Sequence, residues 1–287
     1  MKVTIAKTYG FCQGVRRAID IAKNAASSHP DEPIYMLNKI VHNRAVVDDL
    51  SSLGIVTLEG PASPKEKLRA LNGGIVIFSA HGHDPEEERI ARERKLKIID
   101  ATCPLVKKNL DSIRLALKKQ KKIFYIGIPH HPETEAALAL DASVSLIDFH
   151  HPVVPECDEG EISVHNQTTL IREELQSIHD KIKARYADVS IEDDICFATE
   201  SRQNSLRDIR DEDVIFIVGD TISSNSTRLY ELAKKNNPEK AVFQVSGLED
   251  VKKIDLRNFK KAFLAAGAST PDQAIVPIIA YLESFRP

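Results

Sequence analysis

Three cysteines, Cys12, Cys103 and Cys196, recur along the chain at nearly equal spacings of 91 and 93 residues. Each stands at or near the start of a stretch with helical periodicity. A thiolate at a helix N-terminus is stabilised by the helix dipole and by unpaired amide groups, which suits it to binding a metal. A single cysteine in such a place is more often a small buried side chain. Three cysteines in similar settings favour a shared metal or redox role.

The spacing of these cysteines favours an iron-sulfur cluster over zinc. Zinc sites usually contain a closely spaced pair such as Cys-x-x-Cys, and the sequence has none. If three thiolates bind four irons, one iron keeps an open position for a substrate oxygen. The fourth cysteine, Cys157, lies in the acidic, loop-like stretch 155–159 and is left out of the predicted site.

The charge balance argues against several classes of partner. The chain has 39 Lys and Arg residues against 42 Asp and Glu residues, a net charge of −3, so nothing points to nucleic acid or an anionic membrane. No apolar run approaches the roughly 20 residues needed to cross a bilayer. The first residues lack the basic region and long apolar core of a signal peptide. We therefore expect a soluble cytoplasmic protein, whose thiols stay reduced.

Apolar, β-branched runs alternate with amphipathic stretches along the chain, a pattern that predicts an α/β fold with parallel strands. The predicted strands are 74–78, 122–126, 214–218 and 261–265. The predicted helices are 14–26, 102–119, 170–185, 224–235 and 270–285. The cysteine spacing is close to a third of the chain, which predicts three similar α/β units. Their predicted ranges are 13–102, 103–195 and 196–287.

Polar side chains follow the predicted strands, where α/β sheets usually bind their ligands. His81 and His131 each follow a strand, and imidazoles donate hydrogen bonds to phosphate oxygens. The run 223–226 (Ser-Ser-Asn-Ser) opens a predicted helix and offers an anion hydroxyls, an amide and backbone donors. His42 and Ser269 lie in similar loops. All of these residues are also common as helix caps and loop residues that bind no ligand.

Glu133 is a candidate proton donor. A carboxyl group beside a cluster and a bound anion would have its pKa raised by the surrounding negative charge. The alternative is an ordinary carboxylate in the first turn of a helix. Thr168 and Thr169 either bond a hydroxyl ligand or cap the helix that is predicted to begin near Leu170.

Short segments in order along residues 3 to 280 closely resemble the 4-hydroxy-3-methylbut-2-enyl diphosphate reductase family. The segments are 9–19, 41–43, 78–82, 100–106, 131–133, 167–169, 195–199, 223–226 and 267–269. In that family the reaction is the last step of the non-mevalonate (methylerythritol phosphate) isoprenoid pathway. The resemblance implies a trefoil of three similar α/β units with parallel sheets around a central iron-sulfur cluster.

The resemblance also implies the members of the site. The ligands of one [4Fe-4S] cluster would be Cys12, Cys103 and Cys196, with an open fourth iron for the substrate alcohol. The diphosphate clamp would be His42, His81, His131, Ser223, Ser224, Asn225 and Ser269. Glu133 would relay protons, and Thr168 would hold the alcohol end. Two electrons from ferredoxin or flavodoxin would expel the hydroxyl as water, giving isopentenyl and dimethylallyl diphosphate.

One segment departs from the family pattern. Where the family usually reads Gly-His-x-Gly-His-Pro-Glu, residues 127–133 read Gly-Ile-Pro-His-His-Pro-Glu, and Ala136 stands where a glycine is often found. Because glycine permits backbone conformations that His130 tolerates poorly, we expect a changed turn there.

Two other functions stay open: a cluster dehydratase without net electron transfer, and an iron or redox sensor.

Overall fold

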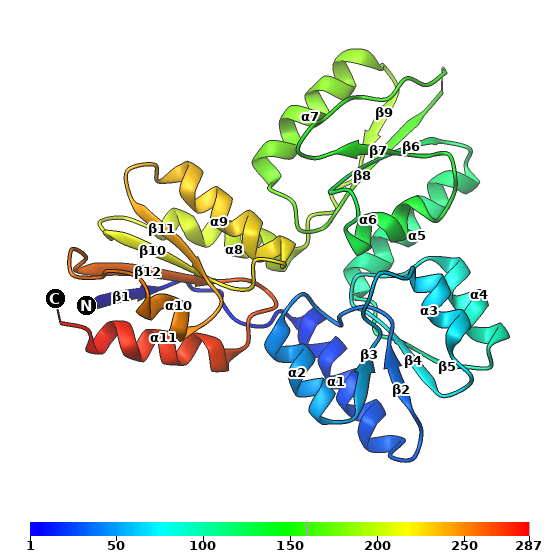
Figure 1. Ribbon diagram of the computed structural model, residues 1–287. Coiled ribbons are helices and arrows are strands. Elements are labelled where there is room, and N and C mark those ends of the chain that lie inside the picture. The colour runs from blue at the N-terminus through cyan, green and yellow to red at the C-terminus, as the bar shows by residue number, and fades with distance from the viewer. Residues whose placement is uncertain (159, 287) are drawn as a thin grey trace. The chain divides into compact units, whose positions relative to one another are not determined.

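The structure is a computed structural model that describes residues 1–158 and 160–286. These residues form three four-stranded sheets, and within each sheet neighbouring strands run parallel (Figure 1). Helices lie in most of the connections between these strands, as is usual for parallel pairing, while β7 is followed directly by β8. The predicted fold class, α/β with three similar units of parallel sheet, is confirmed.

The first sheet along the chain has the strand order β3-β2-β4-β5. Its strands are β2 (Ile34–Met36), β3 (Ile55–Thr57), β4 (Ile75–Phe78) and β5 (Lys97–Asp100). The helices of this region are α1 (Gln13–Ser28), α2 (Arg44–Ser52), α3 (Pro64–Ala70) and α4 (Pro85–Glu93). Strand β4 is buried along its whole length, as its unbroken apolar run predicts.

The second sheet has the strand order β7-β6-β8-β9. Its strands are β6 (Lys122–Gly127), β7 (Val144–Asp148), β8 (Ile162–Asn166) and β9 (Val189–Ile191). The helices are α5 (Pro104–Lys118), α6 (Pro132–Leu138) and α7 (Arg172–Arg185). Leu110 and Ile113 of α5 pack in one core cluster with Ile123 and Tyr125 of β6, so this helix is fixed against the centre of the sheet.

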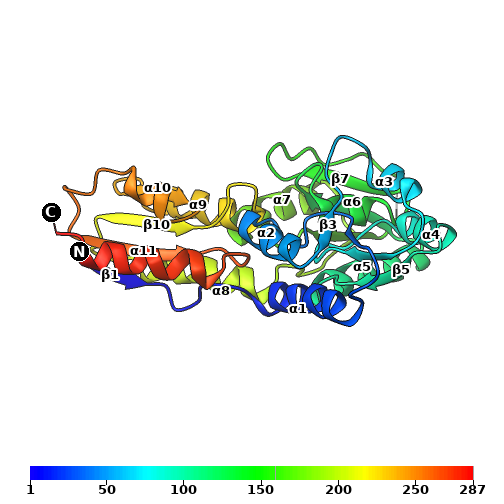
Figure 2. The same ribbon diagram turned by 60° about the horizontal axis from the view of Figure 1, so that its bottom comes forward.

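The third sheet has the strand order β1-β12-β10-β11. Its strands are β1 (Lys2–Ile5), β10 (Val214–Val218), β11 (Ala241–Val245) and β12 (Lys261–Ala266). The helices are α8 (Phe197–Ser205), the short 3₁₀ helix η1 (Leu206–Asp208), α9 (Ser224–Asn236), α10 (Leu248–Lys252) and α11 (Asp272–Ser284). Helices α8 and α9 cover one face of this sheet and α10 and α11 the other (Figure 1). Figure 2 shows α11 running beside β1.

All three sheets share one topology. With strands counted in chain order within each region, the second strand lies at one edge and is followed by the first, the third and the fourth. In the third sheet, β1 from the opposite end of the chain takes the fourth place and pairs with β12. The similarity of the units, first indicated by the cysteine spacing, therefore extends to strand order.

By spatial grouping the chain forms two compact units. Unit 1 comprises Met1–Val15, His42–Val46 and Cys196–Pro287, and unit 2 comprises Arg16–Val41 and Val47–Ile195. Unit 1 contains the sheet of β1, and unit 2 contains the other two sheets. The division into three ranges at 102/103 and 195/196 stays a prediction.

The strands and helices expected from the sequence are present. The ends of β4, β6, β10, β12, α1, α5, α7, α9 and α11 differ from the predicted ends by at most two residues. Among the described residues, none of the helices combines the length and apolarity that a membrane crossing needs.

Candidate active site

The three predicted cluster ligands occupy equivalent places in the three sheets. Cys12 follows β1, Cys103 follows β5 and Cys196 follows β9, each of which is the fourth strand of its sheet. Cys12 immediately precedes α1, while Cys103 and Cys196 are the N-cap residues of α5 and α8. All three are partly buried thiols. The expected position of each cysteine at the start of a helix is confirmed.

The surroundings of these sulfurs fit an iron-sulfur cluster. The backbone N–H of Val15 donates to Cys12 Sγ at 3.4 Å, and that of Thr199 donates to Cys196 Sγ at 3.3 Å. Such amide donors stabilise a negatively charged sulfur and are among the groups that tune cluster potentials. Pro104 occupies the first position of α5 after Cys103, where its fixed φ angle favours the helix start.

The cysteines are divided between the two units. Cys12 and Cys196 belong to unit 1, and Cys103 belongs to unit 2. Within residues 1–158 and 160–286, no group of three or more His, Cys, Asp or Glu side chains that could hold a metal ion is formed. Cys157 lies outside helices and strands, where its backbone N–H donates to the Tyr186 hydroxyl at 3.1 Å.

Glu133 is a buried carboxyl group in the first turn of α6, with 2% of its surface exposed. The backbone N–H of Thr168 donates to Glu133 Oε1 at 2.8 Å, and the Thr168 hydroxyl donates to Oε2 at 3.1 Å. Burial raises the pKa of Glu133 to about 8, although the two bonds from Thr168 act in the opposite direction. The group is therefore mostly protonated at neutral pH and is able to donate a proton.

Burial is the largest cause of this pKa shift among the described residues, and the negative charge of Asp194 adds a smaller contribution. The contribution expected from a cluster and a diphosphate stays a prediction. Thr168 and Thr169 were also candidate caps for the helix that follows. That helix, α7, begins at Arg172, and its N-cap position is occupied by Ile171 rather than by either threonine.

His81 and His131 follow strands of two different sheets and meet within unit 2. Their rings lie edge to face with centroids 5.7 Å apart. Ser79 Oγ lies 3.2 Å from His81 Nδ1, and His131 Nδ1 accepts the backbone N–H of Glu133 at 3.2 Å. The second contact ties a predicted phosphate-binding residue to the backbone of the predicted acid.

A cluster of hydroxyl and amide groups forms at the carboxyl ends of β10 and β12 in unit 1. Ser223 is the N-cap of α9, and its hydroxyl lies 3.1 Å from that of Ser269. Asn225 accepts the backbone N–H of Ala268 at 3.0 Å and donates to Thr199 Oγ1 at 3.0 Å. The structure thus brings together three of the predicted clamp residues of unit 1, all of them buried.

The other two predicted clamp residues of unit 1 are partly buried. Ser224 is the first residue of α9, and His42 lies two residues before α2. Next to His42, the Asn43 side chain accepts the backbone N–H of Val46 at 3.2 Å and so caps the start of α2.

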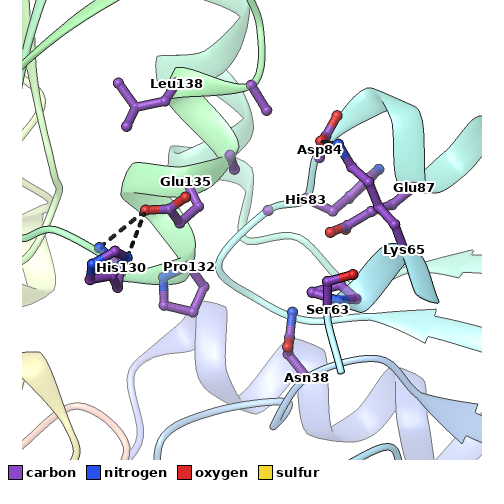
Figure 3. Close-up of a pocket in the computed structure, with 14 residues that line it drawn as sticks. Asn38, Ser63, Lys65, His83, Asp84, Glu87, His130, Pro132, Glu135 and Leu138 are labelled. Carbon is purple, nitrogen blue, oxygen red and sulfur yellow. Dashed lines mark hydrogen bonds and ion pairs between the residues drawn. The ribbon is translucent and has the colours of Figure 1, made fainter. Parts of the chain in front are cut away.

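The segment that departs from the family pattern keeps a conformation typical of glycine. His130 has a φ of 63°, in the left-handed region. Its backbone N–H donates to Glu135 Oε1 at 3.1 Å, and its ring lies 3.8 Å from the same carboxylate (Figure 3). Gln167 Oε1 accepts the N–H of Ile128 at 3.1 Å, which anchors the start of this loop. The sequence therefore places a strained histidine in this turn.

A hollow of about 660 Å³ lies beside this turn within unit 2 (Figure 3). Its polar lining residues include Asn38, Ser63, Lys65, His83, Asp84, Glu87, His130 and Glu135. Burial raises the pKa of Glu87 to about 7. None of the predicted catalytic or clamp residues is among the residues that line this hollow.

Comparison with known proteins identifies the relatives of the chain. Residues 3–283 match the LytB protein family. The chain belongs to the LytB family. Two LytB relatives, from Anoxybacillus flavithermus and a Geobacillus species, are each 38% identical over 291 residues, covering 100% of this chain and 92% of the relative. Both are named 4-hydroxy-3-methylbut-2-enyl diphosphate reductase, so the predicted resemblance is confirmed.

Solved LytB structures agree with this assignment. The structure of the corresponding reductase from Plasmodium falciparum has a TM-score of 0.88 and 28% identity, covering 99% of this chain and 88% of the other. A second has a TM-score of 0.67 and 28% identity, covering 99% and 100% of the two chains. It is described as (E)-4-hydroxy-3-methyl-but-2-enyl diphosphate reductase, the terminal enzyme of the non-mevalonate pathway.

The sequence assigned no role to three buried residues of this LytB chain. Thr199 connects Asn225 to Cys196, because its hydroxyl accepts from Asn225 and lies 3.1 Å from Cys196 Sγ. Gln167 anchors the loop before Glu133, and Arg202 bonds two backbone carbonyls near the cysteines. Only Thr199 carried a signal, since it stands three residues after an N-cap cysteine, where its backbone N–H reaches the cap.

Proposed function

We propose that this chain catalyses the reductive dehydroxylation of 4-hydroxy-3-methylbut-2-enyl diphosphate to isopentenyl and dimethylallyl diphosphate. In this reaction the C–O bond of the alcohol breaks, the hydroxyl leaves as water, and two electrons and two protons are taken up. The observation that carries the proposal is that a partly buried cysteine follows the fourth strand of each of the three sheets. Relatives that match the whole chain bear the name of this reductase.

Cys12, Cys103 and Cys196 are proposed as the protein ligands of one [4Fe-4S] cluster with an open fourth iron. The donor set fits, because the proposed ligands are all thiols and two of them already accept backbone amide bonds. When bound, the cluster supplies electrons and a Lewis-acidic iron. The donor of these electrons is proposed to be ferredoxin or flavodoxin, in a cytoplasmic setting that keeps the thiols reduced.

The diphosphate is proposed to bind a clamp of His42, His81, His131, Ser223, Ser224, Asn225 and Ser269. The hydroxyl pair of Ser223 and Ser269 and the N-terminus of α9 offer hydrogen-bond donors to phosphate oxygens. Histidines add donors and, when protonated, positive charge. Because these contacts are to the part of the substrate that does not react, their role is to bind and orient it.

Glu133 is proposed to donate the proton that assists departure of the hydroxyl. Its raised pKa keeps the proton on the carboxyl group at neutral pH. Thr168 holds both carboxyl oxygens, so the acid has a fixed orientation, and its hydroxyl is proposed to hold the alcohol end of the substrate. A positioned acid is needed because hydroxide is a poor leaving group.

An anaerobic assay tests this function. Reconstituted protein is mixed with reduced viologen and the hydroxymethylbutenyl diphosphate, and viologen oxidation and the products are followed. Oxidation that depends on substrate, with both five-carbon diphosphates formed, supports the reductase. Loss of the substrate hydroxyl without any reductant would indicate a dehydratase instead, and a loaded but inactive protein would indicate a sensor.

A further inference from the structure

Arg202 is a buried cation in α8, with 2% of its surface exposed. Its Nη2 donates to the carbonyl oxygen of Gly10 at 2.6 Å, and its Nη1 donates to that of Ala198 at 2.8 Å. Gly10 stands two residues before Cys12, and Ala198 two residues after Cys196. One guanidinium therefore holds the backbone beside both cysteines of unit 1.

Among the described residues, no carboxylate acts as a counterion of Arg202, and its buried Nε has no hydrogen-bond partner. A buried charge without compensation is costly, so an anion nearby is expected. Burial lowers the pKa of Arg202, whereas the negative charges of Cys12 and Cys196 raise it. Cys12 and Cys196 are thus the ionisable groups whose charge acts on this cation.

We propose that Arg202 is a positioning and charge-compensating residue for the metal centre that Cys12 and Cys196 help to bind. Its two carbonyl contacts hold the Cys12 and Cys196 segments together, and its fixed positive charge favours the more negatively charged, reduced state of the centre. This inference rests on the proposed cluster. Net charge and hydrogen bonding around the thiolates are general determinants of cluster potential.

Three substitutions separate the charge from the backbone contacts. Arg202→Met removes both, Arg202→Gln keeps an N–H donor without charge, and Arg202→Lys keeps the charge without the planar fork. Arg257→Met is the matched control, because Arg257 belongs to the same unit and its side chain is 79% exposed. The full chain is reconstituted anaerobically, and iron content, thermal unfolding and the midpoint potential of the centre are measured for every variant.

We expect the midpoint potential to shift to more negative values in Arg202→Met and Arg202→Gln, and to stay near the wild-type value in Arg202→Lys and Arg257→Met. Equal potentials in wild type and both neutral variants would overturn the charge role. If the neutral variants bind no iron but Arg202→Lys does, charge compensation is supported. If Arg202→Lys also binds no iron, the positive charge has no role apart from the backbone contacts, and the proposal fails.

The wild-type protein distinguishes this proposal from the proposed function. A loaded wild type that turns over substrate, together with unchanged potentials in the neutral variants, overturns only the role of Arg202. A wild type that binds no iron overturns the cluster assignment and the inference built on it.

Discussion

Thr168 donates two hydrogen bonds to the carboxyl group of Glu133, one from its backbone N–H and one from its hydroxyl. The pair connects the end of β8 to the first turn of α6, and both residues are buried. A carboxyl group that is kept protonated by burial and oriented by two fixed donors meets the requirements of a general acid.

Replacing Glu133 by Gln should lower turnover by about 10²–10⁴-fold, because the amide keeps the shape of the carboxyl group but donates no proton. Iron content and cluster absorbance should stay at the wild-type level, since Glu133 is not a proposed ligand. Thr168→Val serves as the companion variant and should lower turnover less, because the backbone donor remains. Full activity in Glu133→Gln would rule out the role as acid.

The pH dependence of turnover should show the ionisation of Glu133. Because its pKa is raised to about 8, the group is protonated below that pH and loses its proton above it. Turnover at saturating substrate should therefore fall as the pH rises through about 8. The residual rate of Glu133→Gln should lack this decline. If turnover of Glu133→Gln declines with the same midpoint, the decline is caused by another group.

Replacing Cys103 by Ser should remove iron and activity together, because the cluster loses one of its proposed ligands. Cys157→Ser is the matched control and should retain both, since Cys157 lies in a loop and contacts the Tyr186 hydroxyl through its backbone. Iron analysis and visible absorbance after reconstitution check both variants. Wild-type iron content in Cys103→Ser would contradict the ligand assignment.

The substitution Gly267→Ala tests the clamp in unit 1, because the structure leaves no room for a side chain at Gly267. A Cβ there would overlap Ser226 Oγ and would lie 3.3 Å from the Ser226 Cα, so α9 would have to move away from β12. Gly267→Ala should therefore raise KM more than it lowers kcat, because Ser223 and Asn225 move with the helix. Gly247→Ala is the control, since a Cβ at Gly247 meets nothing within 4 Å. Unchanged KM in Gly267→Ala would contradict this role of the helix.

Replacing His130 by Gly should stabilise the protein by about 1 kcal/mol, because the left-handed conformation costs an L-residue energy that glycine does not incur. The contact from the backbone N–H to Glu135 remains available to glycine. His130→Ala is the control for loss of the ring and should not stabilise. Urea unfolding measures the change, and a destabilised His130→Gly would show that the ring contributes more than the strain costs.

The parts of the molecule that depend on local pattern were predictable from the sequence. Strand β10 is an unbroken apolar run, and the run from Ser223 caps a helix, so both were found at their observed places. The role of β1 was not predictable, since pairing with β12 joins segments more than 250 residues apart and leaves no local signal. Arg202 was missed for the same reason, because its contact with Gly10 depends on tertiary packing.

The cause of the Glu133 pKa shift also required the structure. The sequence identified Glu133 as a candidate acid, but only the fold shows that burial is the main cause and that Thr168 opposes it. At His130 the sequence predicted a changed turn, whereas the structure has this residue in the left-handed conformation that glycine adopts readily.

The most direct test of the central claim is the electron count of the reaction. Under anaerobic conditions, reduced one-electron viologen is titrated with limiting hydroxymethylbutenyl diphosphate, and the oxidised viologen is compared with the five-carbon diphosphates formed. Reductive dehydroxylation predicts two viologens oxidised for each product molecule, with isopentenyl and dimethylallyl diphosphate together accounting for the substrate consumed. Loss of the substrate hydroxyl with no viologen oxidised would contradict the account.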